Sequence, residues 1–235
     1  MTRNPKLSPP KRLRKLHELL ENTYGPQHWW PAKTPFEVVL GAYLTQNTSW
    51  TAVERSLANL RSAGALTPSG LRELPLEELK ALIRPSGFAT RKAPALKAFI
   101  AMLDEEFNSS LDALAAMPTP QLRIRLLALP GVGPETADAI LLYALNHPVP
   151  VVDEYLRRIA VRHALATPAP GRRGYDQLAS LVRAAFAADP ATAQIPLLNQ
   201  QHALVVAVGK AHCRKAPRCD GCPLQPDLPT TVPKA

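Results

Sequence analysis

The sequence contains no apolar run that is long enough to cross a membrane. No stretch of its 235 residues approaches the roughly 18 consecutive apolar residues that a membrane span needs. The N-terminus is basic and then amphipathic, without the apolar segment or the small-residue cleavage site of a secretory signal. We therefore expect a cytoplasmic protein of bacterial type that does not bind membranes.

Alternating apolar and polar residues are also missing over any length that would predict a β-sheet. Instead, apolar residues recur with the period of an α-helix, as in the leucines 13, 16, 19 and 20 of the segment 12–21. The same period occurs in four further stretches, 36–44, 51–63, 75–83 and 91–107. Three regions lack it: the N-terminal arm, the loop 167–174 and the tail after Cys213. The fold class that this pattern predicts is all-α.

The charge balance points to a polyanionic partner. The chain has 28 lysines and arginines against 19 aspartates and glutamates, a net charge of +9. Such a balance favours nucleic acid as a partner, ahead of an acidic membrane surface. The same balance also occurs in organisms whose proteins are rich in arginine, so charge leaves the question open.

A glycine-rich turn between two predicted helices is the most informative segment. In Leu129-Pro-Gly131-Val132-Gly133, two glycines flank one apolar residue, and Thr136 lies in the first turn of the next helix. Without a Cβ, such a turn can bring its backbone close to a ligand, and the N–H groups of the following helix suit a phosphate oxygen. We expect these residues to bind a DNA backbone. An ordinary turn between helices, capped by glycine, is the alternative.

Asp153 ends an apolar run about one helix further on. An aspartate at this place is usually a helix N-cap. Its spacing from the glycine-rich turn supports a second interpretation, in which the carboxylate faces a flipped nucleotide. There it would stabilise a positively charged sugar and orient a water molecule.

The segments LPGVGPETADAILLYAL and PVPVVDEYLRRI together resemble the helix-hairpin-helix, Gly/Pro-rich and aspartate signature of the endonuclease III superfamily of DNA glycosylases. The resemblance spans roughly residues 28–222. It implies two helical lobes with the active cleft between them: residues 35–146 as a helical barrel, and residues 1–34 plus 147–235 as the second lobe. It also implies Asp153 as the catalytic residue. The implied partner is double-stranded DNA with damaged bases, through which the protein would associate with the nucleoid. We expect the protein to be a monomer.

Two further segments are similar to DNA-contacting parts of this superfamily. Gln46 lies in a stretch, TQNTS, that matches the helix near the residues inserted into DNA. The resemblance places Gln46 at the base pocket, and a wedge near residues 46–50 would fill the gap left by the flipped base. Arg84, Ser86 and Gly87 resemble the turn between helices that contacts DNA. A plain capping turn is the alternative interpretation for the second segment.

Glu135 departs from the pattern of the bifunctional enzymes of the superfamily. In those enzymes a lysine at this position forms a Schiff base with the sugar and permits strand cleavage. A carboxylate cannot form an imine, so the sequence predicts a monofunctional glycosylase with absent or weak lyase activity.

The base pocket is predicted from the tryptophans, Trp29, Trp30 and Trp50, which are the only three in the chain. Each could instead belong to the core. An aromatic slot suits a flat base and suits a cationic one best. The pattern resembles the endonuclease III-like 3-methyladenine DNA glycosylases, which also carry a glutamate in place of the lysine and thus place Glu135 at the pocket. An alkylated purine such as 3-methyladenine is the implied substrate.

Two residues near the C-terminus have less defined roles. Lys210 lies where that subfamily places a lysine reaching toward the active site, and a surface lysine is the alternative. We expect His202 to pack between helices or to join a polar network rather than to act as a catalyst.

The three cysteines of the chain, Cys213, Cys219 and Cys222, lie within ten residues. Such clustering indicates metal binding rather than disulfides. The superfamily carries a [4Fe–4S] cluster on four cysteines here, but the fourth position is Leu228. Three outcomes stay open: a cluster with another fourth ligand, a zinc or three-iron site, or a lost cluster. The candidate fourth ligands are His212, Asp220 and Asp227.

Two other functions stay open. One is an endonuclease III-like glycosylase for oxidised or mismatched pyrimidines, with weak lyase activity through Lys210. The other is a relic that binds lesions without cutting them. The presence of Asp153 argues against the relic, because a pure binder needs no carboxylate near phosphates.

Overall fold

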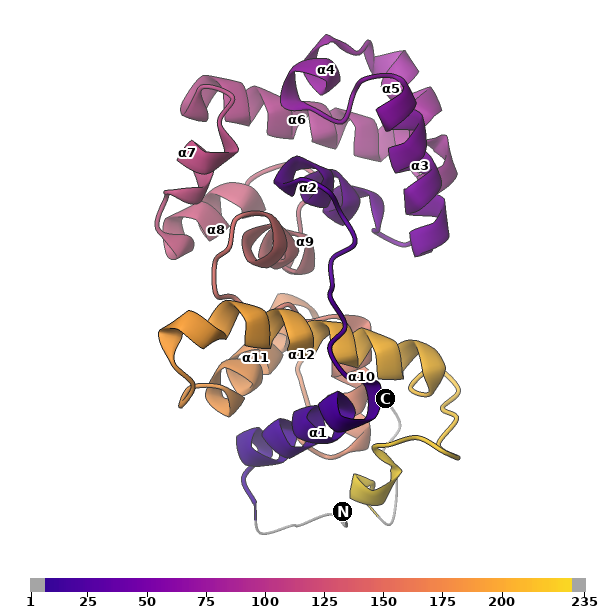
Figure 1. Cartoon of the computed structure of the whole chain (residues 1–235), viewed down its shortest axis with the longest axis vertical. Coiled ribbons are helices and arrows are strands. Elements are labelled where there is room, and N and C mark those ends of the chain that lie inside the picture. The colour runs from indigo at the N-terminus through magenta and orange to yellow at the C-terminus, as the bar shows by residue number, and fades with distance from the viewer. Residues whose placement is uncertain (1–6, 230–235) are drawn as a thin grey trace. The chain divides into compact units, whose positions relative to one another are not determined.

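The computed structural model describes residues 7–229, and within this range the chain is helical, with no β-strand (Figure 1). The all-α prediction is therefore confirmed. No helix within the described range combines the length and the apolar character needed to cross a membrane.

The chain divides into two compact units. One unit is the continuous segment Trp30–His147, and the other joins the described residues up to Trp29 to those from Pro148 onward. The continuous unit contains α2 to α9 and the short helices η1 and η2. Their bounds are α2 Pro35–Leu44, α3 Trp50–Ser62, α4 Pro68–Glu73, α5 Leu76–Leu82, η1 Arg84–Ser86, α6 Ala89–Phe107, α7 Leu111–Ala115, α8 Thr119–Leu127, α9 Pro134–Ala139 and η2 Ile140–Ala144. The core of this unit includes the wholly buried Tyr43 and Phe99, whose rings meet edge to face.

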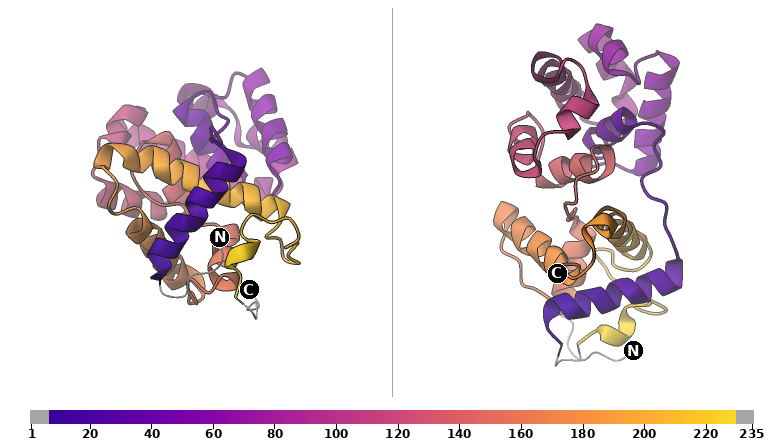
Figure 2. Two further views of the ribbon diagram at one scale, coloured as in Figure 1. Left: turned by 60° about the horizontal axis from the view of Figure 1, so that its bottom comes forward. Right: turned by 60° about the vertical axis from the view of Figure 1, so that its left-hand side comes forward.

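The discontinuous unit is built from four helices and a short 3₁₀ turn, and Figure 2 shows them from two further sides. Their bounds are α1 Pro9–Tyr24, α10 Glu154–Arg162, α11 Gly171–Ala185, α12 Ala191–Ala211 and η3 Gln225–Asp227. Helix α1 packs against α11 and α12, and α12 in turn packs against α10. The contact of α12 with α10 matters for the site, because Asp153 immediately precedes α10.

Local capping explains where many helices begin. Thr34, Ser49 and Thr67 each accept a hydrogen bond from a backbone N–H in the first turn of the following helix. The loop predicted at 167–174 is shorter than expected, because α11 already begins at Gly171. Pro170 has the extended conformation of an N-cap there, and the helix takes up the basic residues that suggested a loop.

Candidate active site

The glycine-rich turn joins α8 to α9. Gly131 has a φ of +74°, which favours glycine, and the N–H of Val132 donates to the carbonyl of Leu129 at 3.3 Å. Leu129 and Val132 are buried and anchor the turn, whereas Gly131 and Gly133 are exposed. The turn thus presents backbone to solvent at its two glycines, as a phosphate-binding hairpin requires.

Gln46 holds this hairpin in place. Its side-chain amide donates to the carbonyl of Gly131 at 2.8 Å and to the hydroxyl of Thr136 at 2.9 Å. Thr136 is 7% exposed, so its hydroxyl serves this internal contact rather than the surface. Gln46, predicted to lie near a DNA-inserting segment, connects the end of α2 to the hairpin.

The turn after α5 offers fewer side chains to a ligand than its sequence suggested. The hydroxyl of Ser86 is buried and lies 2.6 Å from that of Ser56, so the side chain points into the unit and the turn is left with its backbone for a contact with DNA. Buried Lys92 donates to the carbonyls of Ser86 and of Leu44, which ties the turn to the end of α2. Arg84 is exposed and remains available.

Phe88 follows this turn and was missed by the sequence analysis. Its side chain is 57% exposed, and its backbone is left-handed, with a φ of 50°. An exposed phenylalanine beside a turn that resembles a DNA-contacting segment indicates a candidate wedge, because DNA-bending proteins often insert apolar side chains between bases. The sequence signal was present in the phenylalanine that directly follows Gly87.

Asp153 is both an N-cap and a buried carboxylate. Its Oδ1 accepts the N–H of Leu156 at 2.7 Å, which begins α10. The residue is 8% exposed, and burial raises the pKa of its carboxyl from about 3.8 to about 6. The two interpretations of Asp153 are compatible, since the hydrogen bond that caps α10 engages Oδ1 and the carboxylate still has Oδ2.

His202 of α12 lies beside this carboxylate. Its Nε2 is 3.9 Å from Oδ2 of Asp153, and the ring is 9% exposed. Burial lowers the pKa of His202 to about 4, so the ring is neutral at neutral pH. The sequence analysis expected His202 to pack between helices or to join a polar network. Its proximity to Asp153 depends on the packing of α12 against α10, which local patterns do not predict.

A glycine sets how closely these two helices pack. A Cβ placed on Gly209 would lie 2.3 Å from the ring of Tyr155, in the first turn of α10. Only a glycine lets α12 approach α10 at this point. The same close approach carries His202 to Asp153.

The tryptophans fall into two groups. Trp30 meets Trp50 edge to face, with ring centroids 5.4 Å apart, and lies 5.2 Å from Tyr143 of η2. Gly41 of α2 leaves room for Trp30, since a Cβ there would lie 3.2 Å from the indole nitrogen. All three tryptophans are half-buried, which fits neither a core role nor a purely surface one.

Trp29 belongs to the discontinuous unit. There the Nζ of Lys210 lies 5.5 Å from the centroid of its ring, a cation–π contact. Lys210 is exposed, as is Glu135 in the first turn of α9. The position that would carry a Schiff-base lysine therefore presents a carboxylate to solvent.

The three cysteines line one pocket together with Leu228 and His212. Because all three cysteines border the same space, they fit the attachment of an iron–sulfur cluster of the kind that the superfamily carries. Across the described residues, no set of three His, Cys, Asp or Glu side chains converges closely enough to hold a single metal ion. Thiols around a common space suit a cluster, in which each thiolate binds a different iron, better than a zinc site, in which all the ligands meet at one ion.

The candidate fourth ligands differ in their availability. Asp227 accepts a hydrogen bond from Arg12 at 2.6 Å and lies 3.1 Å from the Nδ1 of His163, so it is engaged elsewhere. Asp220 is exposed and does not line the pocket. Of the three candidates only His212 lines it.

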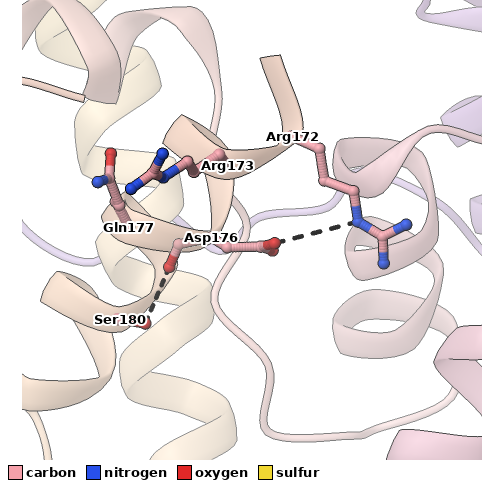
Figure 3. A pocket seen from close by; sticks show the side chains of 5 residues that line it. All are labelled: Arg172, Arg173, Asp176, Gln177 and Ser180. Carbon is pink, nitrogen blue, oxygen red and sulfur yellow. Dashed lines mark hydrogen bonds and ion pairs between the residues drawn. The ribbon is translucent and has the colours of Figure 1, made fainter. Parts of the chain in front are cut away.

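A second hollow lies on one face of α11 (Figure 3). It is lined by Arg172, Arg173, Asp176, Gln177 and Ser180, which are all exposed. Arg172 pairs with Asp176 at 4.0 Å, at the limit of an ion pair. Because all five side chains are exposed and belong to one helix, the hollow lacks the enclosed, buried polar groups of a ligand-binding site. None of the site residues predicted from the sequence lines this hollow.

The chain is similar to known DNA repair glycosylases over most of its length. Residues 40–183 match the model of the family described as "HhH-GPD superfamily base excision DNA repair protein". A protein of Methanocaldococcus jannaschii named as a DNA repair glycosylase is 38% identical over 212 residues, which cover 90% of this chain and 93% of the relative. Endonuclease III of Escherichia coli is 28% identical, with coverages of 90% and 92%.

Among solved structures, the 3-methyladenine DNA glycosylase of H. pylori, bound to 1,N6-ethenoadenine, superposes with a TM-score of 0.73. It is 29% identical to this chain, and the match covers 87% of this chain and 98% of the other.

Proposed function

Because the chain belongs to the HhH-GPD superfamily of base excision DNA repair proteins and is a DNA glycosylase of that class, we propose that it hydrolyses the N-glycosidic bond of a flipped, alkylated purine such as 3-methyladenine. Water is the nucleophile. The observation that carries the proposal is the buried carboxylate of Asp153 in a chain whose Schiff-base position holds Glu135.

Asp153 supplies the chemistry at the sugar. Departure of the base leaves positive charge on the sugar, and a nearby carboxylate stabilises that charge and orients a water molecule. The hydrogen bond from the Leu156 N–H holds the carboxylate in one orientation, so little reorganisation is needed during the reaction. With a pKa of about 6, the group is largely ionised at neutral pH.

Glu135 argues for hydrolysis without strand cleavage. A lyase step needs an amine that attacks the sugar carbon and forms an imine. The carboxylate of Glu135 cannot do this. Its negative charge in the first turn of α9 is also compatible with a cationic base.

The aromatic group of Trp30, Trp50 and Tyr143 supports an alkylated purine as the substrate. Aromatic faces attract a flat, positively charged ring through stacking and cation–π interaction. An alkylated purine is already a good leaving group, so its excision needs little general acid catalysis. The similarity to a solved 3-methyladenine DNA glycosylase adds support.

The DNA backbone and the flipped-out state have separate supports. The exposed backbone at Gly131 and Gly133 would bind phosphates, and Arg84 would add a charged contact. Phe88 is suited to fill the space that a flipped base leaves in the duplex. A monomer suffices for these contacts.

The cysteine pocket is part of the proposal. Cys213, Cys219 and Cys222 would hold three corners of an iron–sulfur cluster, with Leu228 or His212 facing the fourth. Such a cluster would brace the C-terminal loop against α10, where Arg162 already donates to the Sγ of Cys213 at 3.1 Å. The hydrolytic chemistry does not pass through this pocket.

Release of free base from a panel of lesion-containing duplexes tests the proposed function. The panel holds 3-methyladenine, 1,N6-ethenoadenine, an oxidised pyrimidine and a thymine mismatch. We expect release of the alkylated purine by the wild-type protein and none by Asp153→Asn. Excision by Asp153→Asn at the wild-type rate would contradict the assignment.

Borohydride trapping on the same duplexes separates the alternative enzyme. The similarity to endonuclease III and the exposed amine of Lys210 favour a pyrimidine glycosylase with weak lyase activity as the second candidate. That enzyme would be captured as a covalent complex, and Lys210→Gln would abolish the capture. Lesion binding without release of any base would instead identify a non-catalytic binder.

A further inference from the structure

The two carboxylate oxygens of Asp153 lie in different surroundings. Oδ1 accepts the N–H of Leu156, whereas Oδ2 faces the Nε2 of His202 at 3.9 Å. Two charged residues of α10 also act on the carboxylate through space: Arg158 favours its ionised form and Glu154 disfavours it. The backbone N–H of Tyr155 also favours the ionised form. From α12, the imidazole of His202 is the group that lies beside Oδ2.

The orientation of the His202 ring has a clear electrostatic preference. Burial keeps the ring neutral, so Nε2 carries either a proton or a lone pair. A lone pair would repel the carboxylate, and an Nε2–H would attract it. The ring can thus act as a hydrogen-bond donor to Oδ2 without bringing a second charge into the site.

We propose that His202 is a positioning residue for base excision, which donates its Nε2–H to Oδ2 of Asp153 and fixes the carboxylate toward the sugar of the flipped nucleotide. The inference rests on the proposed function of Asp153. A separation of 3.9 Å is longer than a hydrogen bond, but catalytic hydrogen bonds are often long in the ligand-free enzyme and shorten when substrate binds. A shift of about 1 Å closes the gap.

The packing of α12 against α10 keeps His202 beside Asp153. Gly209 presses against the ring of Tyr155, two residues after Asp153, and so ties the register of α12 to that of α10. His202 lies two turns before Gly209 on the same helix. Because both helices are held at this contact, the ring cannot move away from the carboxylate without disturbing the interface.

A second buried histidine provides a matched control. His17 of α1 is 1% exposed, and its Nδ1 lies 2.8 Å from Oε1 of Gln201, the neighbour of His202 in the chain. Burial lowers the pKa of His17 as well. Both histidines are buried at α12, since His202 belongs to this helix and His17 contacts its Gln201. His202 lies beside Asp153, whereas His17 lies beside Gln201 and Glu21.

The test compares His202→Ala, His202→Gln and His17→Ala in the full-length protein. Single-turnover release of the alkylated base is measured from about pH 5 to about pH 9, with the dissociation constant for lesion DNA. We expect His202→Ala to lower the rate about 10-fold to 100-fold and to leave DNA binding nearly unchanged. His202→Gln keeps an N–H donor and should recover most of the rate.

The pH profile separates positioning from packing. Loss of a donor to the anion raises the pKa of Asp153, so the acidic limb of the profile should move to higher pH in His202→Ala. His17→Ala should lose thermal stability and keep the wild-type limb. The carboxyl ¹³C shift of Asp153, titrated by NMR, should show the same displacement without depending on activity.

Failure of this inference is distinguishable from failure of the proposed function. If Asp153→Asn abolishes release while folded His202→Ala keeps the wild-type limb and carboxyl titration, the role of His202 is overturned and that of Asp153 stands. If Asp153→Asn still releases the base, the proposed function itself is overturned. A displaced limb in both histidine variants would reduce the effect to general packing and overturn the inference.

Discussion

The side chain of Gln46, at the end of α2, holds the carbonyl of Gly131 in the hairpin between α8 and α9. The same amide donates to Thr136 in α9, so one side chain spans both sides of the turn. The exposed glycines of the hairpin are thereby kept in one conformation. A loop that is ordered in advance binds a phosphate with less loss of entropy.

Gln46→Ala should therefore weaken DNA binding without touching the DNA-facing backbone. Each of the two lost hydrogen bonds is worth about 0.5–1.5 kcal/mol, so we expect the dissociation constant for lesion DNA to rise about 5-fold to 150-fold. Fluorescence anisotropy measures the affinity, and amide exchange at the hairpin measures its order. Exposed Gln121 of α8 supplies the control substitution Gln121→Ala. An unchanged hairpin exchange rate in Gln46→Ala would contradict the role of the amide.

Asp153→Asn should abolish base release and yet stabilise the protein at neutral pH. Burial raises the pKa of Asp153 from about 3.8 to about 6, so between these pH values the folded chain keeps a proton that the unfolded chain has released. Stability then falls as pH rises through this window, by up to about 3 kcal/mol. Asparagine still caps α10 and avoids this cost.

Thermal denaturation across pH tests this expectation. The melting temperature of Asp153→Asn should exceed that of the wild type at neutral pH, and the difference should vanish below about pH 4. In the wild-type protein, base release should decline as pH falls through about 6, because the protonated carboxyl no longer stabilises the sugar. A variant less stable than the wild type at neutral pH would count against the buried charge.

Gly209→Ala should separate α12 from α10. The added Cβ would lie 2.3 Å from the ring of Tyr155, so the helices must shift. Overpacking of this kind costs about 1–3 kcal/mol of unfolding free energy. Chemical denaturation should show the loss, and base release should fall with it.

A double variant identifies the clash as the cause. Gly209→Ala combined with Tyr155→Ala should be more stable than the sum of the two single changes predicts, since the smaller side chain makes room for the Cβ. Additive losses would show that the glycine acts in another way. Gly133→Ala controls the stability measurement for loss of a glycine without such a neighbour, because Gly133 has a φ of −93° and a Cβ there meets nothing within 4 Å.

Leu228→Cys should strengthen retention of iron. Leu228 lines the pocket with the three cysteines, so a thiol there would supply a fourth ligand. We expect protein prepared without oxygen to show the brown colour of iron–sulfur centres, and Leu228→Cys to hold its iron longer in air. Leu228→Ser keeps the size change but lacks the thiol. A wild-type protein that is folded but colourless and free of iron would contradict the proposal that this pocket holds an iron–sulfur cluster.

Local signals in the chain were sufficient for several features. Helical periodicity predicted α1, α2, α3, α5 and α6 to within a few residues, because that period follows from backbone geometry alone. The glycine turn was predictable for a similar reason, since a φ of +74° at Gly131 favours one residue type. The start of α11 was not, because the arginines and glycines after Pro170 suit both a loop and a first helical turn.

What the sequence by itself determined is the all-α class with five of its helices, the hairpin, the N-cap aspartate and the absence of a lysine at position 135. Tertiary structure alone decided that Ser86 is turned inward, that Gln46 holds the hairpin and that His202 faces Asp153. The difference is one of range. Periodicity, caps and glycine conformations act over a few residues, whereas burial and long-range neighbours exist only once the helices have packed.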